Sequence, residues 1–212
     1  MEWEDLTLSE RYALKTLCEQ DFLTFHKAFF AMTQGEKWKV NWHHKYLAKM
    51  IEKAINGELK GKSLIINVPP GAGKTEVFSI HAPVWSVVQS AKIRNLNVSF
   101  SDSLVKRNSI RSKDVIKSEP FQWMWPMSFA MDKDNEWKLN NPNGKPRAEV
   151  VSRSMGGQIT GGRGGYITED YSGSVTLDDP DKPEDMFSKV KRKRTHRVIV
   201  DTLRTRRGNK SK

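Results

Sequence analysis

The sequence predicts an α/β fold in which a mostly parallel sheet is flanked by helices, with a helical segment at the N-terminus. Short apolar runs such as Ser63–Val68 alternate with longer segments of helical periodicity, and strands that alternate with helices form parallel sheets covered on both faces. A glycine-rich turn at 71–73 joins one of these runs to the helix expected next. The 212 residues, of which 37% are hydrophobic, are enough to bury a core and argue against a disordered chain.

The N-terminal part is expected to be helical. Thr7 and Glu10 form the Thr-x-x-Glu pattern of a capping box, which predicts a helix from there to about Phe30. A second helix is expected over 42–55, because apolar side chains recur on one face and Asn56-Gly57 is a typical helix end.

We divide the chain into an N-terminal helical segment, residues 1–60, and an α/β core, residues 61–212. The core is expected to hold strands at 63–68, 96–100, 149–152 and 175–177, with a further candidate strand at 137–139 in the otherwise irregular region 123–144. Its expected helices span 74–89, with an interruption at Pro83, and 102–117, and a long charged helix begins near Pro183.

Composition excludes several classes of protein. No stretch approaches the roughly 18 apolar residues of a transmembrane helix, and the acidic start, with no apolar run behind it, predicts no signal peptide. The single cysteine, Cys18, excludes an intrachain disulfide and a multi-cysteine zinc site. These features predict a protein of a reducing compartment that is neither secreted nor membrane-bound.

Almost all of the net charge of +11 comes from the C-terminal end. Residues 189–212 hold eleven basic side chains and a single acid, Asp201. Such a local concentration favours a polyphosphate partner, above all nucleic acid. A solvated helix with a frayed end and a run of the nuclear-localisation type are the alternative interpretations.

The strongest functional signal is the segment Pro69-Pro70-Gly71-Ala72-Gly73-Lys74-Thr75, between an expected strand and an expected helix. In such a loop, residues like Pro70, Gly71, Ala72 and Gly73 let backbone N–H groups surround phosphate oxygens, and the helix N-terminus adds partial positive charge. Lys74 is expected to reach the β- and γ-phosphates of ATP, and the Thr75 hydroxyl to ligate Mg²⁺. The usual P-loop pattern has glycine where this chain has Val68. We interpret the segment as a P-loop that departs from the pattern at this position.

A P-loop works with carboxylates at the end of a neighbouring strand. Asp178 and Asp179 follow the expected strand 175–177. We expect Asp178 to hold Mg²⁺, mostly through water, and Asp179 to orient or deprotonate the attacking water. A plain Asp-Asp-Pro turn is the alternative, and Glu169 and Asp170 form a second acidic pair that ranks lower because only two apolar residues precede it.

Seven segments, in order along the chain, together resemble the N-terminal ATPase portion of the large subunit of phage terminases. They are Asn41–His43, Asn67–Thr75, Pro83–Trp85, Ser99–Asp102, Phe121–Pro126, Gly156–Gly164 and Asp178–Pro180. The resemblance extends from about Phe22 to the C-terminus. It implies a P-loop NTPase fold of the ASCE type, with Trp42 and His43 near the nucleotide base.

The resemblance also implies a function. An ATPase of this family hydrolyses ATP with Mg²⁺ to drive double-stranded DNA into a procapsid, and its partners are the portal protein, the small terminase subunit and further copies in a homo-oligomeric ring. Its expected location is the host cytoplasm, with transient residence on the procapsid. The family's last ATPase strand and its nuclease domain have no counterpart in this sequence, so nuclease activity is not expected from it.

One departure from the family concerns charge. Many members carry an arginine in the loop just before Gly-Lys, where this chain has Gly71 and Ala72. Arg163 is our candidate to supply the charge, on its own nucleotide or on that of a neighbouring subunit. DNA binding or the capping of a turn is the alternative role for Arg163. For His43 and His44, structural or base-stacking roles are favoured over zinc binding, which would need further ligands.

Two other functions stay open at this stage. Another P-loop DNA translocase or a helicase would explain the phosphate loop and the basic end, but not Asn41–His43 and the glycine-rich segment before Gly164 in register. A DNA-binding or scaffold protein that binds nucleotide without turnover is the second alternative.

Overall fold

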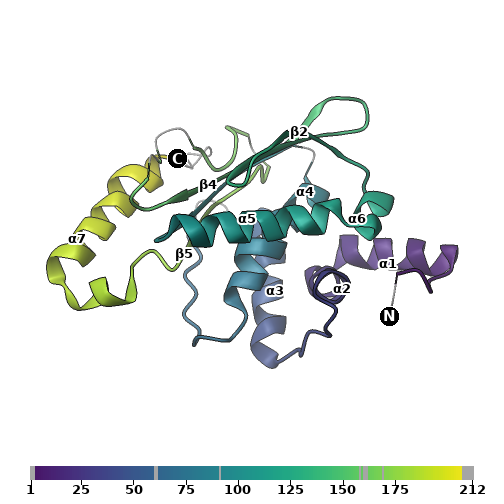
Figure 1. The fold of residues 1–212 in the computed structure, drawn as a ribbon, viewed down its shortest axis with the longest axis horizontal. Helices are drawn as coiled ribbons and strands as arrows, with labels where there is room; N and C mark the ends of the chain where they lie inside the picture. Colours follow the sequence, from purple (N-terminus) through teal and green to yellow (C-terminus); the bar gives the residue numbers. More distant parts are fainter. Residues whose placement is uncertain are drawn as a thin grey trace.

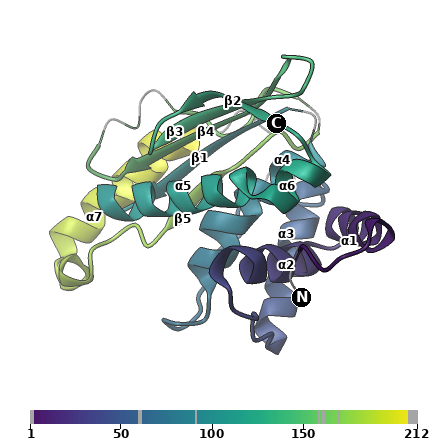
Figure 2. The same ribbon diagram turned by 45° about the vertical axis from the view of Figure 1, so that its right-hand side comes forward.

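The computed structural model describes residues 3–59, 62–90, 92–157, 159, 162–168 and 170–206, without the side chain of Pro183. In this part of the chain, five strands form one open sheet with helices packed on both faces (Figures 1 and 2). The predicted α/β class is confirmed. The interpretations that involve Gln158, Thr160, Gly161, Glu169 and residues 207–212 lie outside the described residues.

The helices account for most of the regular structure. In chain order they are α1 (Leu8–Gln20), α2 (Phe22–Gln34), α3 (Trp42–Ile55), a π-helix (Glu76–His81), α4 (Ala82–Gln89), α5 (Asp102–Lys117), α6 (Glu119–Met124), a 3₁₀ helix (Pro183–Phe187) and α7 (Lys189–Arg197), which continues as a π-helix (Val198–Thr202) and a 3₁₀ turn (Leu203–Arg206). Within the described part of the chain, no helix has the length and apolar character needed to cross a membrane.

The sheet has the order β2-β3-β4-β1-β5, formed by Ser128–Asp132, Glu136–Asn140, Pro146–Ser154, Ile93–Ser99 and Val175–Asp178 respectively. Strand β1 is parallel to both β4 and β5, whereas β2, β3 and β4 pair antiparallel. The expectation of a mostly parallel sheet is therefore wrong, and the sheet is mixed. The difference arises in the region 123–144: the candidate strand at 137–139 is confirmed as part of β3, but it pairs antiparallel with β4 and with β2, a strand that was not predicted.

The two faces of the parallel strands differ in polarity. On one face Leu96, Val98 and Val151 pack with Leu203 of the C-terminal 3₁₀ turn. On the other face, the carboxyl ends of the same strands present polar side chains towards α5 and the π-helix Glu76–His81, among them Asn97, Ser99, Ser152, Thr176 and Asp178. Since successive residues of a strand point to opposite faces, a single alternating pattern produces both surfaces.

The N-terminal helices belong to the same core as the sheet. Phe25 of α2 and Trp85 of α4 are buried in one cluster with residues of β1, β3 and β4, and Trp85 Nε1 donates a hydrogen bond to the carbonyl of Cys18 at 2.8 Å. The capping box of Thr7 is confirmed. The single helix predicted to reach Phe30 is wrong, because Asp21 has an extended backbone and its side chain accepts a hydrogen bond from the Thr24 N–H, which starts a new helix.

The predicted strand Ser63–Val68 is also wrong. Residues 62–69 are irregular and mostly exposed, and Ile65 is 82% exposed. An apolar run forms a strand only where a neighbour pairs with it, and in the described part of the sheet β5 pairs with β1 alone. The helix predicted over 74–89 is formed, but it is widened into a π-helix before Pro83.

Candidate functional site

The candidate site lies at the carboxyl ends of the parallel strands. Ser99 of β1 is in register with Asp178 of β5 and with Ser154 of β4, and Asp179 follows directly. In open α/β sheets, ligands bind in the crevice outside these strand ends. The loop 69–73 and the helix that begins at Lys74 meet the sheet at this edge.

Lys74 and Asp179 contact each other although they are 105 residues apart in the sequence. Lys74 Nζ donates a hydrogen bond to Asp179 Oδ1 at 2.8 Å, and the two side chains are 30% and 53% exposed. An ion pair with this exposure contributes only about 0–1 kcal/mol. The importance of the pair is therefore geometric. The amine predicted to bind phosphate and the carboxylate predicted to act on water lie within hydrogen-bonding distance of each other.

Asp179 has an unusual backbone. Its φ of +45° is the one positive value found among the described non-glycine residues, and the N–H of Phe100 donates to its carbonyl at 3.1 Å. Aspartate tolerates this left-handed region better than most residues. Strained backbone of this kind is concentrated at functional sites, where the surrounding structure maintains it.

The loop 69–73, predicted from the sequence to bind phosphate, is shaped by two glycines with left-handed backbone, Gly71 at φ +80° and Gly73 at φ +76°. The N–H of Ala72 donates to the carbonyl of Pro69 at 3.3 Å, and the N–H of Val77 donates to that of Gly73 at 3.1 Å. A Cβ on Gly73 would lie 2.5 Å from a ring carbon of Trp38. Glycine is therefore required at position 73 for two reasons, conformation and space.

His44 connects the loop to the start of α3. The N–H of Asn41 donates to His44 Nδ1 at 3.0 Å, and His44 Nε2 lies 3.2 Å from the carbonyl oxygen of Ala72. Because Nδ1 accepts, the ring proton is on Nε2, which donates to the loop. Burial, and then the neighbouring His43, lower the pKa of His44, in agreement with a neutral ring.

Trp42 and His43 lie at the exposed start of α3, next to this contact. Trp42 is 75% exposed, and the ring centroid of His43 is 4.0 Å from that of His44. His43 thus lies beside the histidine that contacts the loop, and Trp42 lies beside His43. Their contact with a nucleotide base stays a prediction.

A neutral aromatic layer lies beneath the loop. His26 is fully buried, with its ring centroid 4.5 Å from that of Trp38 and 4.6 Å from that of His81. Burial lowers the pKa of His26 to about 2 and that of His81 to about 4. Neither ring nitrogen of His26 has a hydrogen-bond partner among the described residues, so protonation of this ring would place an uncompensated charge in the core.

The donors around Asp178 fit Mg²⁺. Ser79 Oγ donates to Asp178 Oδ2 at 2.8 Å, and Asp178 and Thr75 are both half-buried. Magnesium prefers oxygen ligands and is commonly held by one or two carboxylates together with waters and substrate phosphates. A carboxylate whose second oxygen, Oδ1, accepts no hydrogen bond from the described residues suits that mode of binding. A larger cluster is not found, since no three His, Cys, Asp or Glu side chains of the described part could hold a metal together.

Arg163 is not part of this cluster. It is exposed, and among the described residues no hydrogen bond or ion pair joins it to Lys74, Asp178 or Asp179. Its neighbour Gly164 packs so closely that a Cβ there would lie 2.4 Å from the carbonyl oxygen of Ser174, which precedes β5. The role of Arg163 in charge compensation stays a prediction.

Three residues that shape the site were not assigned from the sequence. His44 occupies the third position after the helix cap Asn41, the position of a capping-box partner, so this residue had a readable signal. Ser79 lies four residues before Pro83, which also marks it. Trp38 had no signal, because its contact with Gly73 depends on the tertiary fold.

Comparison with known proteins adds no identification. No protein family and no curated protein sequence matches the chain. The function must therefore be argued from the geometry described above and from the resemblance of its motifs.

We predict that the stability of the protein falls as the pH drops below 6.5, the ordinary pKa of histidine. Since the pKa values of His26 and His81 are lowered to about 2 and about 4, the unfolded chain binds more protons than the folded one in this range. Each histidine then lowers the free energy of unfolding by about 1.4 kcal/mol per pH unit, until the pH reaches the pKa of that histidine in the folded protein. Urea unfolding between pH 7 and pH 4.5 measures this slope.

His26→Phe should lower the slope by about the equivalent of one proton, or about 1.4 kcal/mol per pH unit. The matched control is His196→Gln, on the exposed surface of α7, which should leave the slope unchanged. An identical slope in wild type and His26→Phe would contradict the assignment of a neutral, buried His26.

Proposed function

We propose that the chain is a P-loop ATPase of the ASCE type that hydrolyses ATP with Mg²⁺. The observation that carries this proposal is the approach of Lys74 Nζ to Asp179 Oδ1 at 2.8 Å, with Asp178 as the preceding residue. Two segments that are predicted independently, a phosphate loop and an acidic strand end, thus supply their functional groups at one place. An accidental Gly-Lys-Thr tripeptide would not have to lie beside the carboxyl end of a strand of the sheet.

The chain's own residues account for the binding of phosphate. The left-handed glycines at 71 and 73 turn the loop at the start of a helix, where backbone N–H groups and the helix dipole attract anions. Lys74 adds a full positive charge from the first helical position. Phosphoryl transfer needs positioning and charge neutralisation more than covalent chemistry, and these groups are of the required kind.

The two acids have different roles in this proposal. Asp178, with one carboxylate oxygen hydrogen-bonded by Ser79, and the hydroxyl of Thr75 would hold Mg²⁺, which supplies charge neutralisation when bound. Asp179 is more exposed, at 53%, and accepts only the flexible Lys74 among the described side chains. A carboxylate free to exchange its partner suits the orientation or deprotonation of the attacking water.

Trp42 and His43 would border the base, and Arg163 would supply further positive charge from the same or a neighbouring subunit. These roles derive from the resemblance to terminase large subunits. The exposed ring of Trp42 and the exposed Arg163 are compatible with them.

The proposed task of the ATPase is to drive double-stranded DNA into a procapsid, in a ring with the portal protein and the small terminase subunit, in the host cytoplasm. This part of the proposal also rests on the motif resemblance. The basic helix α7 supports a nucleic-acid partner: none of its residues is buried, and Lys193, Arg194 and Arg197 have no ion pair within the described part of the chain.

We predict that Lys74→Ala and Asp179→Asn separate binding from hydrolysis. Lys74→Ala should weaken ATP binding by about 10- to 100-fold, because a hydrogen bond to a charged group contributes about 1.5–3 kcal/mol. Asp179→Asn should bind ATP but reduce turnover by about 10²- to 10⁴-fold, the range for removal of a general base. Asparagine also tolerates the positive φ at this position. Titration calorimetry and phosphate release measure the two properties.

Lys145→Ala, which removes an exposed lysine just before β4, at the amino ends of the parallel strands, is the matched control and should behave as wild type. Equal phosphate release from wild type and both site variants would refute the ATPase. Binding without turnover in the wild type would favour a nucleotide-binding protein that is no enzyme. Strand separation on forked duplex DNA would favour a helicase over a packaging motor.

We further predict that α7 contributes to DNA binding. Replacing Lys193, Arg194 and Arg197 by alanine should reduce the slope of log K against log salt by about 0.9 for each phosphate that the protein no longer neutralises. Fluorescence anisotropy with a short duplex at several salt concentrations measures the slope. A triple variant of Lys27, Lys45 and Lys106, all exposed on other helices, removes the same charge. Equal slopes in the two triple variants would show that α7 does not bind DNA specifically.

A further inference from the structure

We propose that Ser79 is a positioning residue for the carboxylate of Asp178. In this proposal Pro83 widens the helix that contains Ser79, Glu76–His81, so that the Ser79 hydroxyl reaches this carboxylate. The inference deepens the proposed function and rests on it, because it concerns the carboxylate assigned to Mg²⁺. It assigns a role to the π-helix Glu76–His81, which neither the phosphate loop nor the acidic pair accounts for.

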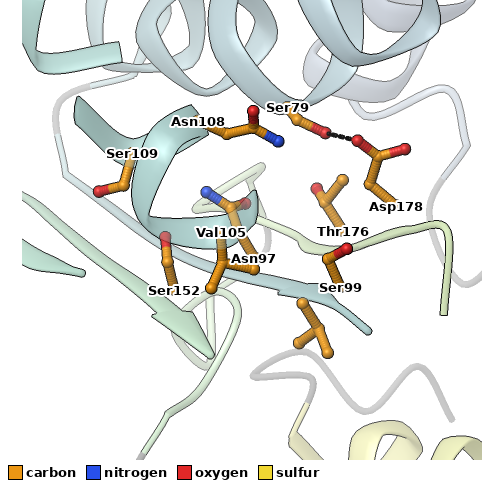
Figure 3. Close-up of a pocket in the computed structure, with 10 residues that line it drawn as sticks. Ser79, Asn97, Ser99, Val105, Asn108, Ser109, Ser152, Thr176 and Asp178 are labelled. Carbon is orange, nitrogen blue, oxygen red and sulfur yellow. Dashed lines mark hydrogen bonds between the residues drawn. The ribbon is translucent and has the colours of Figure 1, made fainter. Parts of the chain in front are cut away.

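The contact itself is direct and partly buried. Ser79 is 5% exposed, and its hydroxyl donates to Asp178 Oδ2 at 2.8 Å, as Figure 3 shows. Among the described residues, Ser79 is the one side chain that donates a hydrogen bond to Asp178. A serine hydroxyl has a single proton, and Ser79 donates this proton to Asp178 Oδ2. The other oxygen, Oδ1, stays available to a metal or to its water.

The shape of the helix explains how Ser79 comes to this position. The N–H of Ala82 donates to the carbonyl of Val77, five residues earlier, which is the π-helical pattern. In an α-helix the carbonyl of Ser79 would accept from residue 83. Proline has no N–H, and its ring clashes with the carbonyl four residues earlier. One wider turn before Pro83 avoids this conflict.

Helix α5 supports the widened turn. The hydroxyl of Ser112, which is buried, lies 3.2 Å from the carbonyl oxygen of Ile80 and 3.1 Å from that of Asn108 on its own helix. The Ser112 hydroxyl of α5 thus offers a hydrogen bond to a backbone carbonyl of the π-helix, where the α-helical hydrogen-bond pattern is interrupted. Wider turns of this kind recur at functional sites.

A small polar cavity adjoins the contact. Asp178 and Ser79 line it together with Asn97 of β1 and with Asn108 and Ser109 of α5 (Figure 3). Three of its polar atoms, Asn97 Oδ1, Asn108 Oδ1 and Ser109 Oγ, have no hydrogen-bond partner in the described part of the chain. Ser79 therefore holds Asp178 at the border of a polar cavity.

The consequence concerns metal affinity. Without the Ser79 hydroxyl, the carboxylate can rotate about its terminal bond, and neither oxygen is held towards the phosphate loop. Partners that orient a metal ligand typically contribute about 10- to 100-fold to metal affinity. We therefore expect Ser79→Ala to weaken the binding of a divalent ion to the nucleotide complex by about 10-fold. Nucleotide affinity in the absence of metal should stay within about twofold, because Lys74 and the loop are untouched.

The experiment measures Mn²⁺ binding to the full chain in the presence of saturating ADP by electron paramagnetic resonance, and ADP binding in EDTA by titration calorimetry. Ser79→Thr keeps the hydroxyl and should restore metal affinity. Ser109→Ala is the matched control, because it removes a buried hydroxyl from the same cavity that does not contact Asp178. It should leave Mn²⁺ affinity unchanged.

Each outcome is decisive. A tenfold reduction in Ser79→Ala with recovery in Ser79→Thr supports the inference, and it does so even if the wild type binds Mn²⁺·ADP without hydrolysing ATP, which would refute only the proposed ATPase. Unchanged Mn²⁺ affinity in Ser79→Ala, or an equal reduction in Ser109→Ala, overturns the inference and leaves the ATPase intact. A wild type that binds no Mn²⁺·ADP overturns both.

Discussion

The candidate site depends on two contacts that join the helix after the loop 69–73 to the end of β5: Lys74 with Asp179, and Ser79 with Asp178. Neither contact is strong enough to create this arrangement, since the first is exposed and the second is one hydrogen bond. The packing of α4 supplies the constraint. Val84 and Trp85 are buried against the N-terminal helices and the sheet in one cluster, and this packing fixes the position of the segment before them, which meets the sheet at its carboxyl edge. The functional contacts are thus a result of core packing.

The distribution of polarity in the sheet follows the same logic. Leu96, Val98 and Val151 make one face of the parallel strands apolar, whereas Asn97 and Ser99 make the opposite face polar at the strand ends. Buried polar groups reduce stability unless they are satisfied. Here they surround a cavity beside Asp178. Such a departure from an apolar core is expected where a site is built, and it coincides with the departure from regular α-helix before Pro83.

The elements that could be predicted are those with local signals. Helix α3 begins and ends where Asn41 and Asn56-Gly57 indicate, and α5 matches its predicted span of 102–117. Asp21 carried a cap signal as well, but a continuous apolar pattern concealed it. The strand predicted over Ser63–Val68 is wrong for another reason. Strand pairing depends on a neighbouring strand, and no property of the apolar run itself specifies such a neighbour. The site divides in the same way. Lys74 and the acids follow from motifs, whereas the Trp38–Gly73 packing and the Ser79–Asp178 bond exist only in the folded chain.

The charge available near the loop is limited. His44, His26 and His81 have lowered pKa values and add no positive charge at neutral pH. Arg111 is paired with Glu76, and Lys74 is the cation that faces the acidic strand end. A triphosphate carries several negative charges, and its transfer needs them neutralised. In the proposed function, the loop carries Gly71 and Ala72 where many terminase large subunits carry an arginine, so backbone N–H groups and Lys74 leave a deficit. We propose that Mg²⁺ at Asp178 and an arginine such as Arg163 supply the rest of the positive charge.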